Sequence, residues 1–567
     1  MMFKMNNLSA IFITACIFFG SFNISFADPY KPLDTDFIKA EKIKKKTPKK
    51  KNSNQKKDKK SKKKKYVDII KGFKSTQGLL DLFWNDSSGK VYLSLKPEQL
   101  DKIFFFNLTR ESGDALFFDG SSMLQEFPVI FNKIGEKIYF IKKNVKFRAD
   151  KESPIYKSIE NHTSNSIIAT TKIIGLPHQE SGAILIDASE LFLRDFQYLG
   201  PMTSGKLKLD KKNSYFFSMN SFPFNTEIEI ALHFISKKPP YVYTLPDSRS
   251  MIPKYRISIS DNTNDSFEPR VADDRVGHFL TIFQDYSETL QENAYIRYIN
   301  KWDLKKRNPN AELSKPIKPI VFWLENTIPN EFRDAVRTGV LAWNEAFEAI
   351  GYKDAIEVYQ MPDDANWDPA DVRYSTIRWM FQPGRGYAVG PSRANPFTGE
   401  LYDADIRISA DFVRSFFTEY EEFIDPLMDS DGFYSELYDS SHSHNEHCFY
   451  GDHLHNEMTK SWNYMVANGT IDGSKEELMD YVNKGIIDLI LHEVGHTLGL
   501  RHNFKASSIY TPNQLKNKKF TEKNGISGSV MDYHGVNTFN DVNHFQTKPG
   551  PYDYWAIEYA YASPPYN

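Results

Sequence analysis

Cysteine is almost absent from this chain of 567 residues, which contains only Cys16 and Cys448. Removal of the export signal described below would leave Cys448 alone, so no disulfide could form within the mature chain. An exported protein without disulfides must rely on its hydrophobic cores and on metal for stability. The N-terminal region of the mature chain has no cysteine, which also excludes a sulfur-based latency switch in that region.

The chain also lacks an N-terminal apolar run long enough to span a membrane comfortably. Lys4 precedes a mostly apolar stretch, residues 8–22, and Ser25-Phe26-Ala27 then forms a small-x-small cleavage site. This pattern predicts a signal peptide at residues 1–27, a periplasmic or extracellular mature chain and no transmembrane helix in it. The alternative is a lipid anchor on Cys16, because residues 13–16 resemble a bacterial lipobox.

Excess positive charge is confined to the start of the chain. Residues 1–65 carry a net charge of +13, which leaves −15 for residues 66–567, and this argues against nucleic acid as a partner. Residues 39–65 hold 16 lysines and no aromatic side chain able to stack on bases. We expect residues 28–65 to form a disordered linker, or alternatively an electrostatic attachment to an anionic cell-envelope surface.

Short runs of alternating apolar and polar residues dominate residues 66–285. Examples are V-Y-L-S-L at 91–95 and K-I-Y-F-I at 137–141, with turn signals between them. The pattern predicts a β-rich domain of unknown function without a catalytic constellation. Residues 286–316 are expected to connect it to the next domain, with a short helix around residues 296–302.

From residue 317 the pattern changes to mixed strands and helices. P-I-V-F-W-L at 319–324 predicts a buried strand, Pro329 a helix start and Gly351 its end. The helix has one apolar stripe, formed by Phe332, Val336, Val340, Trp343 and Phe347. Further strands are expected at residues 355–359, 372–379, 386–390 and 403–409. We therefore predict an α+β chain, with a mixed twisted sheet and packed helices at residues 317–567.

The strongest motif lies at residues 485–504 and reads H-E-x-x-H-x-x-G-x-x-H. His492 and His496 lie one turn apart on one face of a helix, where they can hold one zinc ion. Glu493 is placed to act as a general base on a water molecule. Gly499 can take the left-handed conformation that ends a helix, which would bring His502 back as third ligand. Ser474 to Glu477 form a capping box before this helix.

Together with S-V-M-D-Y at residues 529–533, this motif resembles the metzincin zinc peptidases. The resemblance is closest to large exported bacterial metalloproteases that carry a β-rich domain before the catalytic one. It covers most of residues 66–567, including R-V-G-H-F at 275–279 and G-Y-A-V-G-P-S at 386–392. It implies a metzincin-like catalytic domain at residues 317–567, one catalytic zinc ion and cleavage of peptide or protein substrates.

The resemblance also assigns roles beyond the zinc ligands. Met531 would form an apolar floor beneath the histidines, and Tyr533 would stabilise the transition state. An edge strand would pair with the extended substrate through its main chain. By position, that strand consists of Gly386, Tyr387, Ala388, Val389 and Gly390.

Residues 441–455 contain many potential metal ligands, which are His442, His444, His447, Cys448, His453 and His455. They form either a second metal site or a polar surface loop. Two alternatives to a zinc endopeptidase also remain. One is a zinc-binding envelope protein with an inactive, truncated catalytic domain, since the resembling proteins continue beyond the equivalent of Asn567. The other is a zinc hydrolase of a non-peptide amide.

Overall fold

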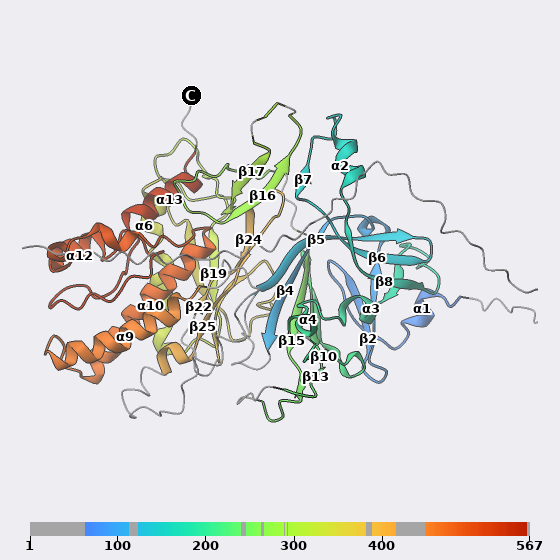
Figure 1. The fold of residues 1–567 in the computed structure, drawn as a ribbon, viewed down its shortest axis with the longest axis horizontal. Coiled ribbons are helices and arrows are strands. Elements are labelled where there is room, and N and C mark those ends of the chain that lie inside the picture. Colours follow the sequence, from blue (N-terminus) through green and yellow to red (C-terminus); the bar gives the residue numbers. More distant parts are fainter. Residues whose placement is uncertain are drawn as a thin grey trace, which may run out of the picture. The chain divides into compact units, whose positions relative to one another are not determined.

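The computed structural model describes most of the chain from residue 63 onward (Figure 1). The described residues are 63–112, 123–203, 205–239, 245–261, 266–288, 290–291, 293–381, 388–414 and 448–563. Residues 63–567 form one compact unit. The expected signal peptide, the lipobox alternative at Cys16 and the lysine-rich linker to residue 62 lie outside the described residues. Among those described, no helix is long and apolar enough to cross a membrane.

The first half of this unit is built on an antiparallel sheet of eleven strands (Figure 1). In spatial order these are β1 (Lys74–Thr76), β2 (Asp81–Asn85), β3 (Lys90–Leu95), β9 (Ile184–Asp187), β8 (Ser166–Ile174), β6 (Lys137–Lys142), β5 (Met123–Ile134), β4 (Phe104–Ser112), β15 (Lys254–Ser260), β12 (Asn225–Ala231) and β11 (Tyr215–Ser221). Its core is rich in phenylalanine, and Phe104, Phe106, Phe131 and Phe140 are all buried within it. The alternation of apolar and polar residues reflects one-sided burial in β6, whereas β3 and β12 are buried on both faces.

The second half contains a mixed sheet of five strands. Their order is β20 (Ile356–Gln360), β19 (Ile320–Leu324), β21 (Ser375–Met380), β25 (Ile406–Ser409) and β22 (Ala388–Val389). The first four are parallel, and β22 pairs antiparallel with β25 at the edge. The chain is therefore α+β, with a β-rich N-terminal region followed by helices on a mixed sheet, as the sequence predicts.

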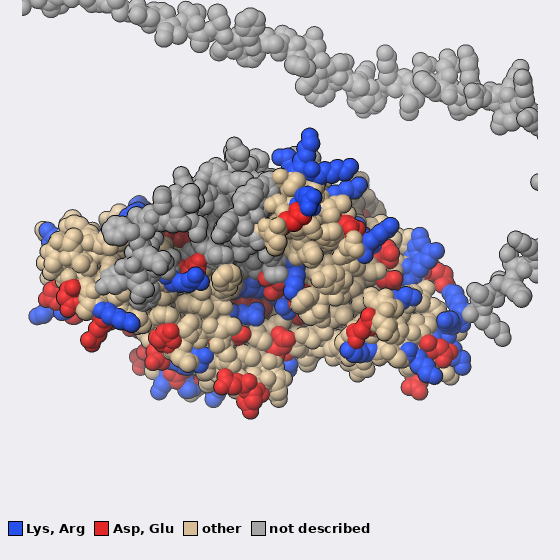
Figure 2. All heavy atoms as spheres, turned by 90° about the horizontal axis from the view of Figure 1, so that it is seen from below, with Lys and Arg blue, Asp and Glu red and all other residues tan. Residues whose placement is uncertain are grey.

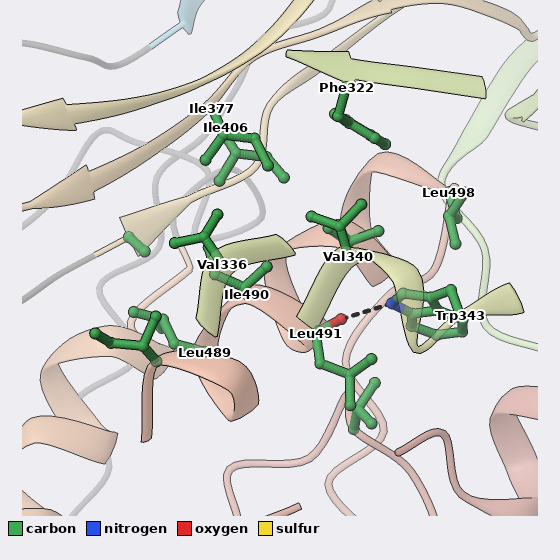
Figure 3. Packing of buried hydrophobic residues seen from close by; sticks show 14 of the residues in the cluster. Phe322, Val336, Val340, Trp343, Ile377, Ile406, Leu489, Ile490, Leu491 and Leu498 are labelled. Carbon is green, nitrogen blue, oxygen red and sulfur yellow. Dashed lines mark hydrogen bonds between the residues drawn. The ribbon is translucent and has the colours of Figure 1, made fainter. Parts of the chain in front are cut away.

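Helices pack on this sheet as the apolar stripe predicts. The stripe forms α5 (Arg333–Leu341) and α6 (Asn344–Glu348), and its five apolar residues are all buried. Figure 3 shows Val336 and Val340 between the sheet residues Phe322, Ile377 and Ile406 and the long helix α10 (Lys475–Thr497). Trp343 Nε1 donates a hydrogen bond to the carbonyl of Leu491, 2.9 Å away (Figure 3). This contact fixes α5 and α6 against the helix that carries the histidine motif.

Two further helices complete the core around α10. α9 (Tyr450–Ala467) packs beside α10, where Tyr481 donates a hydrogen bond to the carbonyl of Met458 (Figure 1). α13 (Pro551–Tyr561) packs against α6, with Phe347 and Tyr561 rings 5.2 Å apart. The other α-helices of the described residues are short: α1 (Tyr66–Ile69), α2 (Tyr156–His162), α3 (Ala188–Phe192), α4 (Leu199–Met202), α11 (Pro512–Leu515) and α12 (Lys518–Asn524).

The short helix expected around residues 296–302 is wrong. The segment forms β17 (Tyr295–Ile299), which pairs antiparallel with β16 (Leu280–Asp285), and β18 (Lys301–Trp302), which pairs with β24 (Glu400–Ala404). Tyr295-Ile-Arg-Tyr-Ile is rich in β-branched and aromatic residues, and its cross-strand partners decide its conformation. β24 also pairs with β23 (Ser392–Ala394), and β16 with β7 (Phe147–Arg148).

The remaining strands form a separate small sheet, and the exposed charges are mixed. The small sheet consists of β10 (Lys208–Leu209), β13 (Phe234–Ile235) and β14 (Ser250–Met251). On the face shown in Figure 2, acidic and basic side chains are interspersed among the described residues.

Candidate metal centre

The helix α10 carries the first two histidines of the motif. Ser474 caps its N-terminus by accepting a hydrogen bond from the amide of Glu477. The Glu477 carboxylate accepts hydrogen bonds from the amides of Asp472 and Gly473, two residues and one residue before the Ser474 amide that a capping box requires. His492 and His496 follow near the C-terminal end, both buried, with their ring centroids 4.8 Å apart.

Gly499 turns the chain so that His502 reaches the same point. Its φ of +99° is the left-handed conformation expected from the motif, and a Cβ there would lie 2.1 Å from the carbonyl oxygen of Asn300. The Phe279 amide donates to the carbonyl of Gly499, and the Arg501 amide donates to that of Gly277. Segments far upstream therefore hold the turn, and His502 Nε2 lies 3.1 Å from His496 Nε2.

The histidine rings are oriented for metal binding. His492 Nδ1 lies 2.6 Å from the carbonyl oxygen of Val530, and His496 Nδ1 lies 2.8 Å from that of Leu500. Each contact favours a proton on Nδ1, which leaves Nε2 free to act as a ligand. Burial lowers the pKa of His496 to about 3 and that of His502 to about 4, so both rings are neutral at physiological pH. These three converging nitrogens fit a zinc ion.

A fourth potential ligand is present that the sequence analysis did not assign to this site. Cys448 Sγ lies 3.4 Å from His492 Nε2 and 3.5 Å from His502 Nε2. Its sulfur and the three histidine nitrogens all lie within 4.8 Å of one another. No spacing rule connects Cys448 with a motif that begins 44 residues later. The only signal was that it is the sole cysteine after residue 16 and lies in a histidine-rich stretch.

Glu493 lies in the same pocket, close to the Cys448 side chain and the Gly390 backbone. The residue is completely buried, and both of its carboxylate oxygens lack a hydrogen-bond partner. Burial raises the pKa of Glu493 to about 8. Gly390 lies directly against it, because a Cβ on Gly390 would be 2.5 Å from the Glu493 carbonyl oxygen and 3.3 Å from Oε2.

The predicted substrate strand is partly described. Ala388 and Val389 form β22 at the edge of the five-stranded sheet, and Gly390 continues past Glu493. Gly386 and Tyr387 lie outside the described residues. The edge position leaves one side of β22 unpaired within the described sheet, which is the arrangement that strand addition requires.

Met531 and Tyr533 both reach the histidine cluster from the segment after it. Met531 is buried beneath α10, where a Cβ on Gly495 would lie 2.3 Å from its sulfur. The ring of Tyr533 lies 4.8 Å from that of His502, and its hydroxyl accepts a hydrogen bond from the Phe449 amide. Burial raises the pKa of Tyr533, so its hydroxyl stays protonated at physiological pH.

Comparison with known proteins agrees with this geometry. Residues 474–567 match the family model described as Met-zincin. The C-terminal segment is a Met-zincin segment. Residues 121–307 match the model described as domain of unknown function DUF5117. No curated protein and no solved structure matches the chain. The Met-zincin match and the histidine cluster together indicate a zinc-binding protein of the metallopeptidase class.

A polar network behind the Met-zincin histidines was missed at the sequence level. The Tyr450 ring stacks on His492 at 4.0 Å, and its hydroxyl donates to Asp488 Oδ1. His534 Nε2 lies 3.1 Å from the same hydroxyl, and although burial lowers the pKa of His534, Asp488 raises it overall. The three residues are far apart in the sequence, so only the fold brings them together.

The potential metal ligands of residues 441–455 do not come together as one second metal site among the described residues. His442, His444 and His447 lie outside the described residues. His453 and His455 belong to α9, where the His453 ring packs on Tyr533 and His455 Nδ1 contacts the Phe412 carbonyl. Within the described residues, the only group of metal-ligand side chains is the one that joins Cys448 to the three histidines.

Proposed function

We propose that the protein is an exported zinc-dependent endopeptidase that holds one zinc ion through His492, His496 and His502. One observation carries this proposal: three neutral imidazole nitrogens converge beside a buried carboxylate that has no partner among the described residues. Zinc bound there supplies a Lewis acid that polarises a carbonyl group and increases the acidity of water. The Met-zincin match supports the same chemistry.

Glu493 has the position of the general base. A carboxylate directly after the first ligand reaches a water molecule held beside the histidines, takes its proton and passes it to the departing amine. Burial favours this exchange, because it brings the pKa of Glu493 to about 8, close to neutral pH. The protonated hydroxyl of Tyr533 would donate a hydrogen bond to the substrate carbonyl oxygen, where negative charge develops.

The substrate would bind as an added strand along residues 386–390. Main-chain pairing at a sheet edge holds an extended peptide with little regard to its side chains. Gly390 has no Cβ, which lets this segment pass close to Glu493 and would place the scissile bond beside the carboxylate. The same proposal includes the domain limits given above, the export signal at residues 1–27 and the attachment of the lysine-rich linker to anionic surfaces.

Substitution of Glu493 tests the mechanism. Because Cys448 is a potential fourth ligand, the test uses the Cys448→Ala chain. Glu493→Gln keeps the size of the side chain and removes its basicity, so in this chain we expect unchanged zinc content and at least a hundredfold loss of casein cleavage, on the order of a general-base contribution. Glu476→Gln, an exposed change on the same helix, should leave both unchanged. Equal cleavage by the Cys448→Ala chain with and without Glu493→Gln would show that the mechanism is wrong.

A zinc-binding protein without hydrolytic activity is the second candidate, and Cys448 favours it. Four protein ligands are typical of structural zinc sites, whereas catalytic sites have three and an open position. If this alternative holds, the protein would bind one zinc ion per chain. It would cleave no peptide library, even when Cys448 is replaced or alkylated.

A further inference from the structure

The position of Cys448 is fixed by its neighbours. Directly after it, the Phe449 amide donates a 2.8 Å hydrogen bond to the Tyr533 hydroxyl. Tyr450 then begins α9 with its ring stacked on His492 and its hydroxyl bound to Asp488. These contacts hold residues 448–450 against the histidine cluster, and Cys448 is 8% exposed. The sulfur is therefore directed into the site rather than placed at its rim.

The sulfur occupies the place that an open catalytic site needs for water. It lies within hydrogen-bonding distance of His492 Nε2 and His502 Nε2, and 3.6 Å from the Tyr533 hydroxyl. The buried Glu493 carboxylate is a second sign of a ligand site here, since neither of its oxygens makes a hydrogen bond of acceptable distance and angle among the described residues, although the Cys448 side chain and the Gly390 backbone lie close enough to lower its pKa. Three imidazoles and a thiolate form a complete tetrahedral donor set for zinc.

We propose that Cys448 is the fourth zinc ligand and keeps the site closed until its sulfur is displaced. The inference rests on the proposed function, because a closed site is latent only if the open site hydrolyses peptides. While the sulfur is in place, water cannot take its position and the Tyr533 hydroxyl stays engaged by the Phe449 amide. Displacement exchanges one sulfur ligand for one water molecule and involves no oxidant or reductant.

Cobalt substitution tests the ligand assignment without any measurement of activity. The full chain with Cys16→Ala, in which Cys448 is the only thiol, is loaded with Co²⁺ in place of zinc. We expect a near-ultraviolet thiolate-to-cobalt charge-transfer band in this parent and its loss in both Cys448→Ala and Cys448→Ser. Equal metal content and equal unfolding temperature in the three chains show that the variants fold. An identical spectrum in parent and variants overturns the proposal.

Alkylation gives a second test on the parent chain alone. Iodoacetamide forms a bond between its methylene carbon and the sulfur, with iodide as leaving group. Zinc should protect Cys448, so we expect the reaction to be at least tenfold faster after the metal is removed with a chelator. The same rate with and without zinc overturns the assignment, because a ligated and buried sulfur cannot react at an unchanged rate.

Peptide cleavage separates latency from the proposed function. The zinc-loaded Cys448→Ala variant should cleave a peptide library at least tenfold faster than its parent, and Cys448→Ala combined with Glu493→Gln should cleave none. Equal cleavage by parent and Cys448→Ala overturns latency. If the parent shows the thiolate band but Cys448→Ala cleaves no peptide, Cys448 is confirmed as a ligand. The proposed endopeptidase function is then wrong.

Discussion

At the scale of single residues, the three histidines and Glu493 of this Met-zincin segment follow from the sequence motif. The spacing of His492 and His496 on one helix and the turn at Gly499 predict that the three histidines meet, and their rings lie close together. Cys448, Tyr450 and His534 could not be predicted, since they reach the cluster through packing of α9 and the segment after α10. A spacing rule finds ligands on one helix and misses those supplied by neighbouring elements.

Removal of one histidine should abolish zinc binding. His496 is buried, and its Nδ1 is fixed by the Leu500 carbonyl, so His496→Ala removes a ligand that no neighbour replaces. We expect zinc retention after dialysis to fall by at least tenfold, as measured by atomic absorption. His544→Ala, a half-buried histidine outside the cluster, should retain the parent's zinc, and full retention by His496→Ala would contradict the assignment.

Tyr533→Phe should separate binding from chemistry. Loss of one donor to a developing oxyanion reduces kcat by about 10²–10³ in other hydrolases. We expect a reduction of that order in the Cys448→Ala background, with KM and zinc content little changed. Tyr510→Phe, which removes a hydroxyl bonded to the Asn524 carbonyl, is the control. A kcat equal to that of the Cys448→Ala chain would exclude Tyr533 from the reaction.

At the scale of helices and strands, the apolar stripe of α5 and the length of α10 follow directly from helical periodicity. The strand β17 does not, because its conformation depends on pairing with β16 and on contacts with the turn at Gly499. Periodicity describes one element at a time. It therefore predicts elements that bury one face, and fails where a distant segment decides the conformation.

The crossing of α5 and α10 depends on Gly339. A Cβ at this position would lie 2.8 Å from the Ile487 carbonyl oxygen and 2.9 Å from the Ile490 Cβ. Gly339→Ala should separate the two helices and lower the free energy of unfolding by about 1–3 kcal/mol, despite the higher helix propensity of alanine. Urea unfolding followed by circular dichroism measures the change, with the exposed Thr338→Ala as control. A stability equal to that of the parent would contradict this close packing.

At the scale of the whole molecule, residues 63–567 form one unit, in which polar contacts join the large sheet to residues 370–407. Glu111 of β4 accepts a 2.8 Å hydrogen bond from Arg256 Nε, and its Oε1 lies 3.8 Å from Nη2 of Arg407 in β25. Asn225 donates a hydrogen bond to the Ala370 carbonyl, and Arg393 donates one to Ser258. No local pattern predicts such contacts. The limits of the domains, including the connector at residues 286–316, remain a prediction.

This charge cluster predicts sensitivity to acid. Burial alone would raise the pKa of Glu111, but Arg256 and Arg407 overcome it and hold the pKa at about 2, against 4.5 for the free side chain. The stabilisation, about 3 kcal/mol, is present above pH 4.5 and is lost as the pH falls toward 2. The difference in unfolding free energy between the parent and Glu111→Gln should therefore shrink over that range. Glu98→Gln, an exposed control, should show no such trend, and a constant difference for Glu111→Gln would contradict the account.

Zinc analysis paired with peptide cleavage tests the central claim most directly. The Cys448→Ala chain is purified, its zinc content is measured, and its cleavage of a peptide library is followed before chelation, after chelation and after zinc is restored. The account predicts one zinc ion per chain, cleavage that disappears with the metal and returns with it, and none in the Glu493→Gln derivative. Stoichiometric zinc with no cleavage in any of these states would contradict it.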